Sequence, residues 1–274
     1  MNRRVRDIVL SLMPHALVSE RQRRKHTIRY VGEYSNWEEA RKFSSGYDDQ
    51  AIFQKVKDAA LKVQRGEASW ERDSVLCERV QHSWPVLAAL LWVASKNDNR
   101  LSILDFGGSL GSSYFQNRKF LVHLRQLRWN VVEQKHFVDC GKELLEDDTL
   151  RFHYDLALCA KEENPSVVLL SSVLQYVPDP YGVISRIFNL GVPYVIIDVT
   201  PFVEASRDRL TVQRVPPTIY DASYPCWIFG ERRFMEEIGR MYQTVEEFAV
   251  RVDPPVHFKG ADVSFKGFIM KKRS

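Results

Sequence analysis

The sequence has few cysteines and no long apolar run. Its four cysteines lie far apart at irregular spacing, and no two of them form a Cys-x-x-Cys pair. This spacing argues against a zinc site or a redox motif and indicates free thiols in a reducing cytoplasm. No run of about 18 apolar residues occurs, so we expect no membrane-spanning helix. Asp7 and Pro14 interrupt the apolar stretch near the N-terminus, which argues against a secretory signal.

The sequence also lacks a metal-binding pattern and a large excess of charge. None of the seven histidines has a partner at the spacing of metal ligands. The net charge at pH 7 is only +4. A catalytic face that binds nucleic acid would usually spread basic charge over the core. We therefore expect neither a metal nor a nucleic acid as a partner.

The basic charge is concentrated in residues 1–30, which carry eight basic residues against two acidic ones. Within this stretch, Val5, Ile8 and Leu12 follow a helical spacing and predict a short basic amphipathic helix. Such a helix either packs against the body of the protein or attaches it to an anionic membrane surface. We expect a cytoplasmic protein, and the second alternative would add a peripheral location at the inner membrane face.

Helical patterns dominate the first third of the chain. They predict helices over residues 37–43, 48–64 and 73–95, with Pro85 as a kink or a boundary in the last one. We see no internal repeat and no low-complexity tract. We predict a basic, helical N-terminal extension over residues 1–72 and a catalytic domain over residues 73–274.

After residue 100, short apolar runs alternate with polar helical stretches. The runs over residues 101–104, 129–132, 167–170 and 194–197 are typical of strands buried on both faces of a parallel sheet. Two further strands, over 245–252 and 264–271, follow each other closely and predict an antiparallel hairpin at one edge. The predicted fold is α/β: a doubly wound, Rossmann-like sheet of seven strands, mostly parallel, with this hairpin at its C-terminal end.

The first of these strands leads directly into the segment Asp-Phe-Gly-Gly-Ser-Leu-Gly-Ser over residues 105–112. Glycines let the chain turn tightly and let a ligand approach the backbone. The helix that follows offers unpaired N–H groups at its start. Ligands of doubly wound sheets bind at the carboxyl ends of the strands. The loop therefore has the chemistry of a nucleotide-like cofactor site.

The next strand ends at Glu133, 22 residues after Gly111. An acid at this position can accept hydrogen bonds from both hydroxyls of a ribose. The dinucleotide fingerprint Gly-x-Gly-x-x-Gly is incomplete, because Phe106 stands at its first position. This departure counts against the alternative of an NAD-type oxidoreductase or epimerase on a related fold.

Asp105 stands two residues before the first glycine of the loop, which is a feature of class I S-adenosylmethionine (SAM)-dependent methyltransferases. The order of elements with its final hairpin also resembles this class. The segments LDFGGSLGSSYF, WNVVEQ, VVLLSSVLQYVPDPYGV and YVIIDVTPF resemble those of a bacterial methyltransferase group associated with O-antigen and surface-polysaccharide biosynthesis. The similarity covers roughly residues 30–270. One departure is Ser109, which stands where many members of the class have their second glycine.

The resemblance implies SAM as the cofactor and a saccharide or glycolipid-linked glycan as the methyl acceptor, with transfer to oxygen favoured. The residues predicted to bind the cofactor are Asp105, Gly107, Gly108, Ser109, Gly111, Glu133, Gln134, Ser171 and Ser172. A third alternative is a non-catalytic scaffold that docks on a membrane complex through residues 1–30.

Candidates for the acceptor side follow the predicted strands over residues 167–170 and 194–197. Gln175 and Tyr176 could border the reactive centre, or they could belong to a packed helix start. Asp198 could deprotonate an acceptor hydroxyl or cap the next turn. His257 could act as a base if the loop between the last two strands folds over the site. His82 could reach the cofactor pocket.

Residues 207–229 form a polar and aromatic insertion after the predicted strand over residues 194–197. Methyltransferases often use this region as a lid over the acceptor, and Tyr, Trp and Arg can stack on sugars or pair with anions. A structural Pro-rich loop is the alternative. The predicted acceptor-binding residues are Gln175, Arg214, Tyr220, Tyr224 and Trp227.

Overall fold

The computed structural model describes residues 28–45, 50–72, 74–216, 222–252 and 255–273. Most of the basic N-terminal segment and Tyr220 lie outside these ranges. In the described part, no helix is long and apolar enough to cross a membrane. All four cysteines are free thiols, as predicted.

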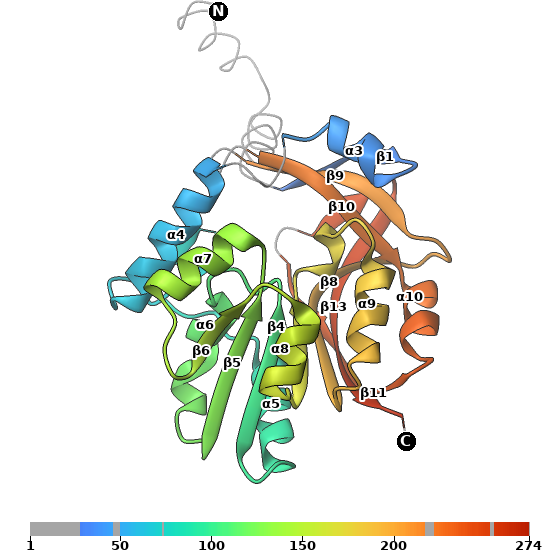
Figure 1. Cartoon of the computed structure of the whole chain (residues 1–274). Coiled ribbons are helices and arrows are strands. Elements are labelled where there is room, and N and C mark those ends of the chain that lie inside the picture. Colours follow the sequence, from blue (N-terminus) through green and yellow to red (C-terminus); the bar gives the residue numbers. More distant parts are fainter. Residues whose placement is uncertain (1–27, 46–49, 73, 217–221, 253–254, 274) are drawn as a thin grey trace, which may run out of the picture.

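The predicted fold is confirmed by seven strands within one hydrogen-bonded sheet, which has eleven strands among the described residues (Figure 1). In chain order, the first five of these seven strands are parallel, and the last two form the expected antiparallel hairpin against the fifth. In spatial order the strands are β6 (Leu150–His153), β5 (Gln126–Val132), β4 (Arg100–Phe106), β7 (Val167–Ser171), β8 (Tyr194–Val203), β13 (Ala261–Lys272) and β11 (Tyr242–Val250). A short strand, β12 (Val256–Phe258), pairs with the start of β13.

Helices cover both faces of this sheet, as in a doubly wound fold. Successive residues of one strand point to opposite faces, so Ile103 of β4 lies in one apolar core and Leu104 in the other. The first core contains side chains of α4 (Gln50–Gln64), α5 (Trp84–Ser95), α6 (Ser112–Leu121) and α7 (Lys135–Leu144). The second contains side chains of α8 (Leu156–Glu163), α9 (Pro180–Asn189) and α10 (Glu231–Ile238).

The predicted helix over residues 73–95 is wrong in its first half. Only α5 forms there, and it begins at Trp84 with Pro85 in its first turn. Proline suits this position because its missing N–H would have no helical partner and its φ is already close to the helical value. The preceding chain instead forms a two-stranded hairpin of β2 (Trp70–Arg72) and β3 (Val75–Cys77).

A second, antiparallel group of strands lies beside the central sheet. It consists of β1 (Arg29–Tyr34), β9 (Arg209–Val215) and β10 (Ala222–Gly230), and the end of β10 pairs with the end of β8. The insertion after the fifth strand is therefore built on a strand pair rather than on a loop. The N-terminal extension is not purely helical either, because β1 joins this group while α3 (Trp37–Lys42) and α4 form as predicted.

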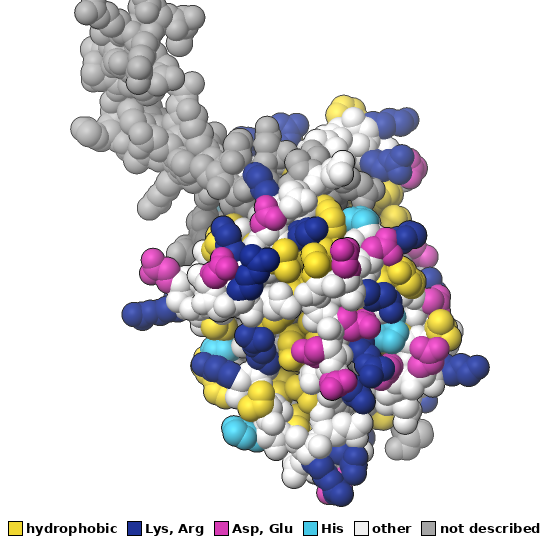
Figure 2. All heavy atoms as spheres, turned by 60° about the vertical axis from the view of Figure 1, so that its left-hand side comes forward, with side chains coloured by type: hydrophobic (Ala, Val, Ile, Leu, Met, Phe, Trp, Pro, Cys, Tyr) yellow, Lys and Arg dark blue, Asp and Glu magenta, His cyan; other side chains and the backbone are white. Residues whose placement is uncertain are grey.

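The surface turned forward in Figure 2 carries basic and acidic side chains interspersed with one another. This view agrees with the small net charge of the chain outside its N-terminal segment.

Candidate functional site

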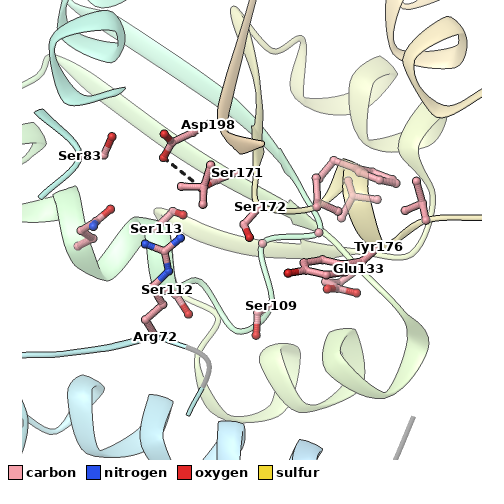
Figure 3. A pocket seen from close by; sticks show the side chains of 18 of the residues that line it. Arg72, Ser83, Ser109, Ser112, Ser113, Glu133, Ser171, Ser172, Tyr176 and Asp198 are labelled. Atoms are coloured by element: carbon pink, nitrogen blue, oxygen red, sulfur yellow. Dashed lines mark hydrogen bonds between the residues drawn. The ribbon is translucent and has the colours of Figure 1, made fainter. Parts of the chain in front are cut away.

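A cavity of about 990 Å³ opens at the carboxyl ends of the parallel strands. Residues that follow β4, β5, β6, β7 and the middle of β8 line it, and the β2–β3 hairpin, α3 and β10 contribute further walls. Figure 3 shows Glu133 and Tyr176 on one side, Asp198 and Ser83 on the other, and Ser109 and Ser172 between them. The cavity thus lies where ligands of doubly wound sheets bind.

Asp105 supports the glycine loop from below. It is 1% exposed, does not line the cavity, and accepts a hydrogen bond of 2.9 Å from the Trp129 indole N–H at Oδ2. Burial raises the pKa of Asp105 to about 7, which the Trp129 bond opposes and the charge of Glu133 reinforces. A Cβ at Gly108 would lie 2.5 Å from Asp105 Oδ2, so only glycine lets the loop pass this closely over the carboxyl.

The loop above Asp105 requires left-handed backbone at three positions. Gly107 and Gly111 have φ of +73° and +87°, and Ser109 adopts φ +54°. A Cβ at Gly107 would lie 2.3 Å from Val173 Cγ2. Ser109 therefore takes a backbone conformation that favours glycine. Gly107, Gly108 and Ser109 all line the cavity, whereas Gly111 directly precedes α6 and does not line it.

Glu133 lies half-buried at the end of β5, on the cavity wall. Its Oε2 accepts a hydrogen bond of 2.6 Å from the backbone N–H of Gln134. Burial raises the pKa of Glu133, and the backbone N–H groups of Gln134 and Ser109 oppose the shift. A carboxylate held by backbone donors in this way is oriented to accept hydrogen bonds from hydroxyl groups of a ligand.

Ser171 and Ser172, at the end of β7, line the cavity as predicted, and Ser172 has φ +54°. Gln175 does not line it. Its side chain is 1% exposed, and Nε2 donates to Ser172 Oγ (3.1 Å) and to the carbonyl of Val199 (3.2 Å). Gln175 thus ties the loop after β7 to β8, and this contact rather than an acceptor accounts for its position.

A β-bulge turns Asp198 toward the cavity. Two residues of β8, Asp198 and Val199, stand opposite the single residue Gly267 of β13, because Ile197 pairs with Phe268 and Thr200 with Lys266. Val199 has φ +50°, a costly conformation for a β-branched residue. Such bulges often re-aim a side chain next to an active site.

Asp198 is 4% exposed and carries a carboxyl oxygen, Oδ1, with no hydrogen-bond partner among the described residues. Its Oδ2 accepts a long hydrogen bond of 3.4 Å from the hydroxyl of Ser171. Burial raises the pKa of Asp198, and the positive charge of Arg72 opposes the shift. A buried, incompletely bonded carboxyl on a cavity wall is costly unless a ligand completes it.

The aromatic side of the cavity involves Tyr176 and Tyr224. The Tyr176 hydroxyl donates to Gln213 Oε1 (3.0 Å), the Gln213 amide donates to the Tyr224 hydroxyl (3.3 Å), and the two tyrosine rings meet edge to face. Both tyrosines line the cavity. This network holds the wall formed by β9 and β10 against the loop after β7.

Three further predicted residues do not line the cavity. Arg214 is exposed on β9, while the Trp227 indole stacks on Trp37 and donates to the carbonyl of Val177 (3.1 Å). His257 is exposed on β12, with Nδ1 2.6 Å from Asp262 Oδ1. The insertion therefore contributes Tyr224, and not the whole predicted set, to the cavity wall.

Sequence reasoning missed Arg72 and the contiguous stretch 81–85, apart from His82. All of these residues line the cavity. Their positions depend on the β2–β3 hairpin, which no local pattern indicated, and on the start of α5 at Trp84, for which Pro85 was the only signal. Within the described ranges, no cluster of His, Cys, Asp and Glu side chains could hold a metal ion.

No family model and no curated protein matches the sequence. Several solved structures are similar. The N-terminal domain of EvdMO1, crystallised with SAH and D-fucose, shares 14% identity at a TM-score of 0.49, over 82% of this chain and 97% of that one. A SAM-dependent methyltransferase from Methanosarcina mazei shares 12% identity at a TM-score of 0.47, over 70% and 99%.

A third similar structure is the magnesium protoporphyrin IX methyltransferase of Synechocystis PCC 6803 with bound SAM. It shares 12% identity at a TM-score of 0.42, over 82% of this chain and 98% of that one. Likeness at this level concerns the arrangement of the elements, so the chemistry has to be argued from the cavity itself.

Proposed function

We propose that this protein is a SAM-dependent methyltransferase that transfers a methyl group to an oxygen of a sugar or glycan. One observation carries the proposal. A glycine loop and the Glu133 carboxylate form one wall of a cavity, and the buried carboxyl of Asp198 lies at its other side. The wall with the glycine loop and Glu133 suits a nucleoside. The side with Asp198 suits an acceptor hydroxyl, which must lose its proton during the reaction.

The residues present fit this cofactor. Glu133 would accept hydrogen bonds from the ribose hydroxyls, and the backbone of Gly107, Gly108 and Ser109 leaves room for close approach of the ligand. Gln134 lies beside Glu133, and Ser171 and Ser172 close the cavity from the β7 side. When bound, SAM supplies a methyl group that is already activated as a sulfonium, so the protein needs mainly to position the reactants.

Asp198 is the proposed general base. Its partly unsatisfied carboxyl would accept the proton of an acceptor hydroxyl, and burial makes it more basic than an exposed aspartate. Ser171 orients the carboxyl through its hydroxyl. Tyr176 and Tyr224 offer aromatic surface on which a sugar ring could pack. His257 has no part in this proposal.

We further propose that residues 1–30 give the protein a peripheral location at the cytoplasmic face of a membrane. The excess of basic residues there supports this idea, because anionic lipid headgroups attract such segments. A glycolipid-linked acceptor would then be within reach. The division of the chain into an extension over 1–72 and a catalytic domain from 73 remains a prediction.

Isothermal titration of the intact protein with S-adenosylhomocysteine (SAH) tests the proposal. We expect binding of SAH and none of NAD. Glu133→Gln should weaken SAH binding roughly tenfold or more, because hydrogen bonds to an ionised acceptor contribute about 1.5–3 kcal/mol. Glu143→Gln, an exposed change on α7, serves as the control. Folded protein that binds NAD but not SAH would contradict the proposal.

A further inference from the structure

The β2–β3 hairpin is fixed to the start of α6, directly beside the glycine loop. Trp70 is 3% exposed and donates from its indole N–H to the carbonyl of Ser112 (3.3 Å). Glu71 is 2% exposed and accepts hydrogen bonds from the Ser112 hydroxyl and from the backbone N–H of Ser74. These contacts set the position of the next residue along the strand, Arg72.

Arg72 projects from this hairpin into the cavity. Figure 3 shows its guanidinium near Ser112 and Ser113, on the side where Asp198 and Ser171 lie. Among the residues that the structure describes, no acid forms an ion pair with Arg72, although its positive charge opposes the rise that burial causes in the pKa of Asp198. The cavity therefore holds a guanidinium whose charge no described carboxylate neutralises at contact distance.

The surroundings of Arg72 suit an anionic group of a ligand. The first turn of α6 brings backbone N–H groups with no helical partner, and these favour an anion. A guanidinium binds a carboxylate in a two-pronged geometry that an ammonium group cannot reproduce.

We propose that Arg72 binds the α-carboxylate of the amino-acid part of SAM and so selects a nucleoside that carries this part. The inference rests on the proposed function, which puts the ribose at Glu133, on the other side of the cavity. Arg72 is then a specificity residue supplied by an element that precedes the parallel sheet in the sequence. Glu133 recognises the nucleoside, and Arg72 recognises what is attached to it.

Two probes separate these contributions. SAH contains the amino-acid part, and 5′-methylthioadenosine contains the same nucleoside without it. For the full-length protein, isothermal titration should show tighter binding of SAH than of methylthioadenosine. Arg72→Ala should weaken SAH binding about 10- to 100-fold, as expected for loss of charged hydrogen bonds, and should leave methylthioadenosine binding unchanged. Glu133→Gln should weaken the binding of both probes.

Arg72→Lys keeps the positive charge but cannot form the two-pronged contact of a guanidinium. It should therefore bind SAH more tightly than Arg72→Ala and less tightly than the wild type. Arg79→Ala removes an exposed arginine outside the cavity and should change neither affinity. Equal binding of both probes by the wild type, or an Arg72→Ala variant that affects both or neither, would overturn the role of Arg72. Wild-type protein that binds neither probe would instead overturn the proposed function. Circular dichroism of each variant checks that it is folded.

Discussion

At the scale of single residues, Asp198 is the side chain on which the proposed chemistry depends. Asp198→Asn keeps the shape and removes the base, so we expect methyl transfer to fall about 10²-fold or more while SAH affinity stays close to that of the wild type. Transfer of labelled methyl from SAM to a panel of nucleotide sugars, with titration of SAH alongside, would measure both. Unchanged transfer by the variant would remove Asp198 from the mechanism.

The pH dependence of the same reaction follows from the sign of the shift. Because burial raises the pKa of Asp198, the carboxyl stays protonated to a higher pH than an ordinary aspartate and acts as a base only above its own pKa. The rate of methyl transfer by the wild type should therefore rise with pH, and this ascending limb of the pH–rate curve should be absent in Asp198→Asn. Ser171→Ala, which removes only the hydroxyl beside the carboxyl, should shift this limb without abolishing it.

Asp105 makes a separate prediction about stability. Its pKa is about 7 in the folded protein and 3.8 as the ordinary value, so between these limits the folded state holds a proton that the unfolded chain has released. Stability from this group is therefore lost as pH rises from about 4 to about 7. Relative to Asp105→Asn, the wild type should lose on the order of 2–3 kcal/mol of unfolding free energy between pH 5 and pH 8.

Urea denaturation of both proteins at these two pH values measures the difference. Glu133 and Asp198 also carry raised pKa values, but both proteins share them, so they largely cancel in the comparison. Asp148→Asn, at an exposed position, provides a control that should follow the wild type. Parallel pH curves for wild type and Asp105→Asn would show that Asp105 is ionised throughout.

At the scale of elements, the sequence allowed the central sheet to be predicted but not the second group of strands. The strands around Ile103, Val168 and Ile196 are short apolar runs buried on both faces, so each carries its own signal. In contrast, β1 exists only because it pairs with β9, where Arg29 lies opposite Arg214. No local pattern encodes a partner that lies this far along the chain.

The same distinction explains which parts of the site were predicted. Asp105, Glu133 and Ser171 stand directly at strand ends, so a correct strand assignment also locates them. Arg72 reaches the cavity through the packing of Trp70 against α6, and Gln175 is withdrawn from it by contacts with Ser172 and Val199. Tertiary contacts determine the positions of both Arg72 and Gln175. The position of Arg72 was also missed because a helix was expected over residues 73–83, where the β2–β3 hairpin forms instead.

At the scale of the whole molecule, the Arg72 proposal bears on the predicted division of the chain into an N-terminal extension and a catalytic domain. The predicted boundary between residues 72 and 73 would cut the β2–β3 hairpin, in which Arg72 pairs with Val75. The extension also supplies β1 and α3, and α3 contributes Trp37 to the cavity wall. A catalytic unit that begins at residue 73 would lack both the cation and part of that wall. The extension is therefore better regarded as part of the site.

The basic segment at the N-terminus leads to a prediction for the full-length protein. Its charge is strongly positive while the rest of the chain is slightly acidic, so electrostatic attraction to anionic lipid would be confined to this end. We expect cosedimentation with vesicles that contain phosphatidylglycerol, weaker binding at high salt, and little binding to pure phosphatidylcholine.

Replacing Arg21, Arg23, Arg24 and Lys25 together by alanine should weaken vesicle binding at least about tenfold, since each such charge contributes about 1 kcal/mol near a membrane. SAH affinity provides the internal control, because these substitutions change none of the residues that are proposed to bind the cofactor. Vesicle binding that survives both high salt and the fourfold substitution would locate the membrane contact elsewhere. An absence of vesicle binding by the wild type would contradict the proposed peripheral location.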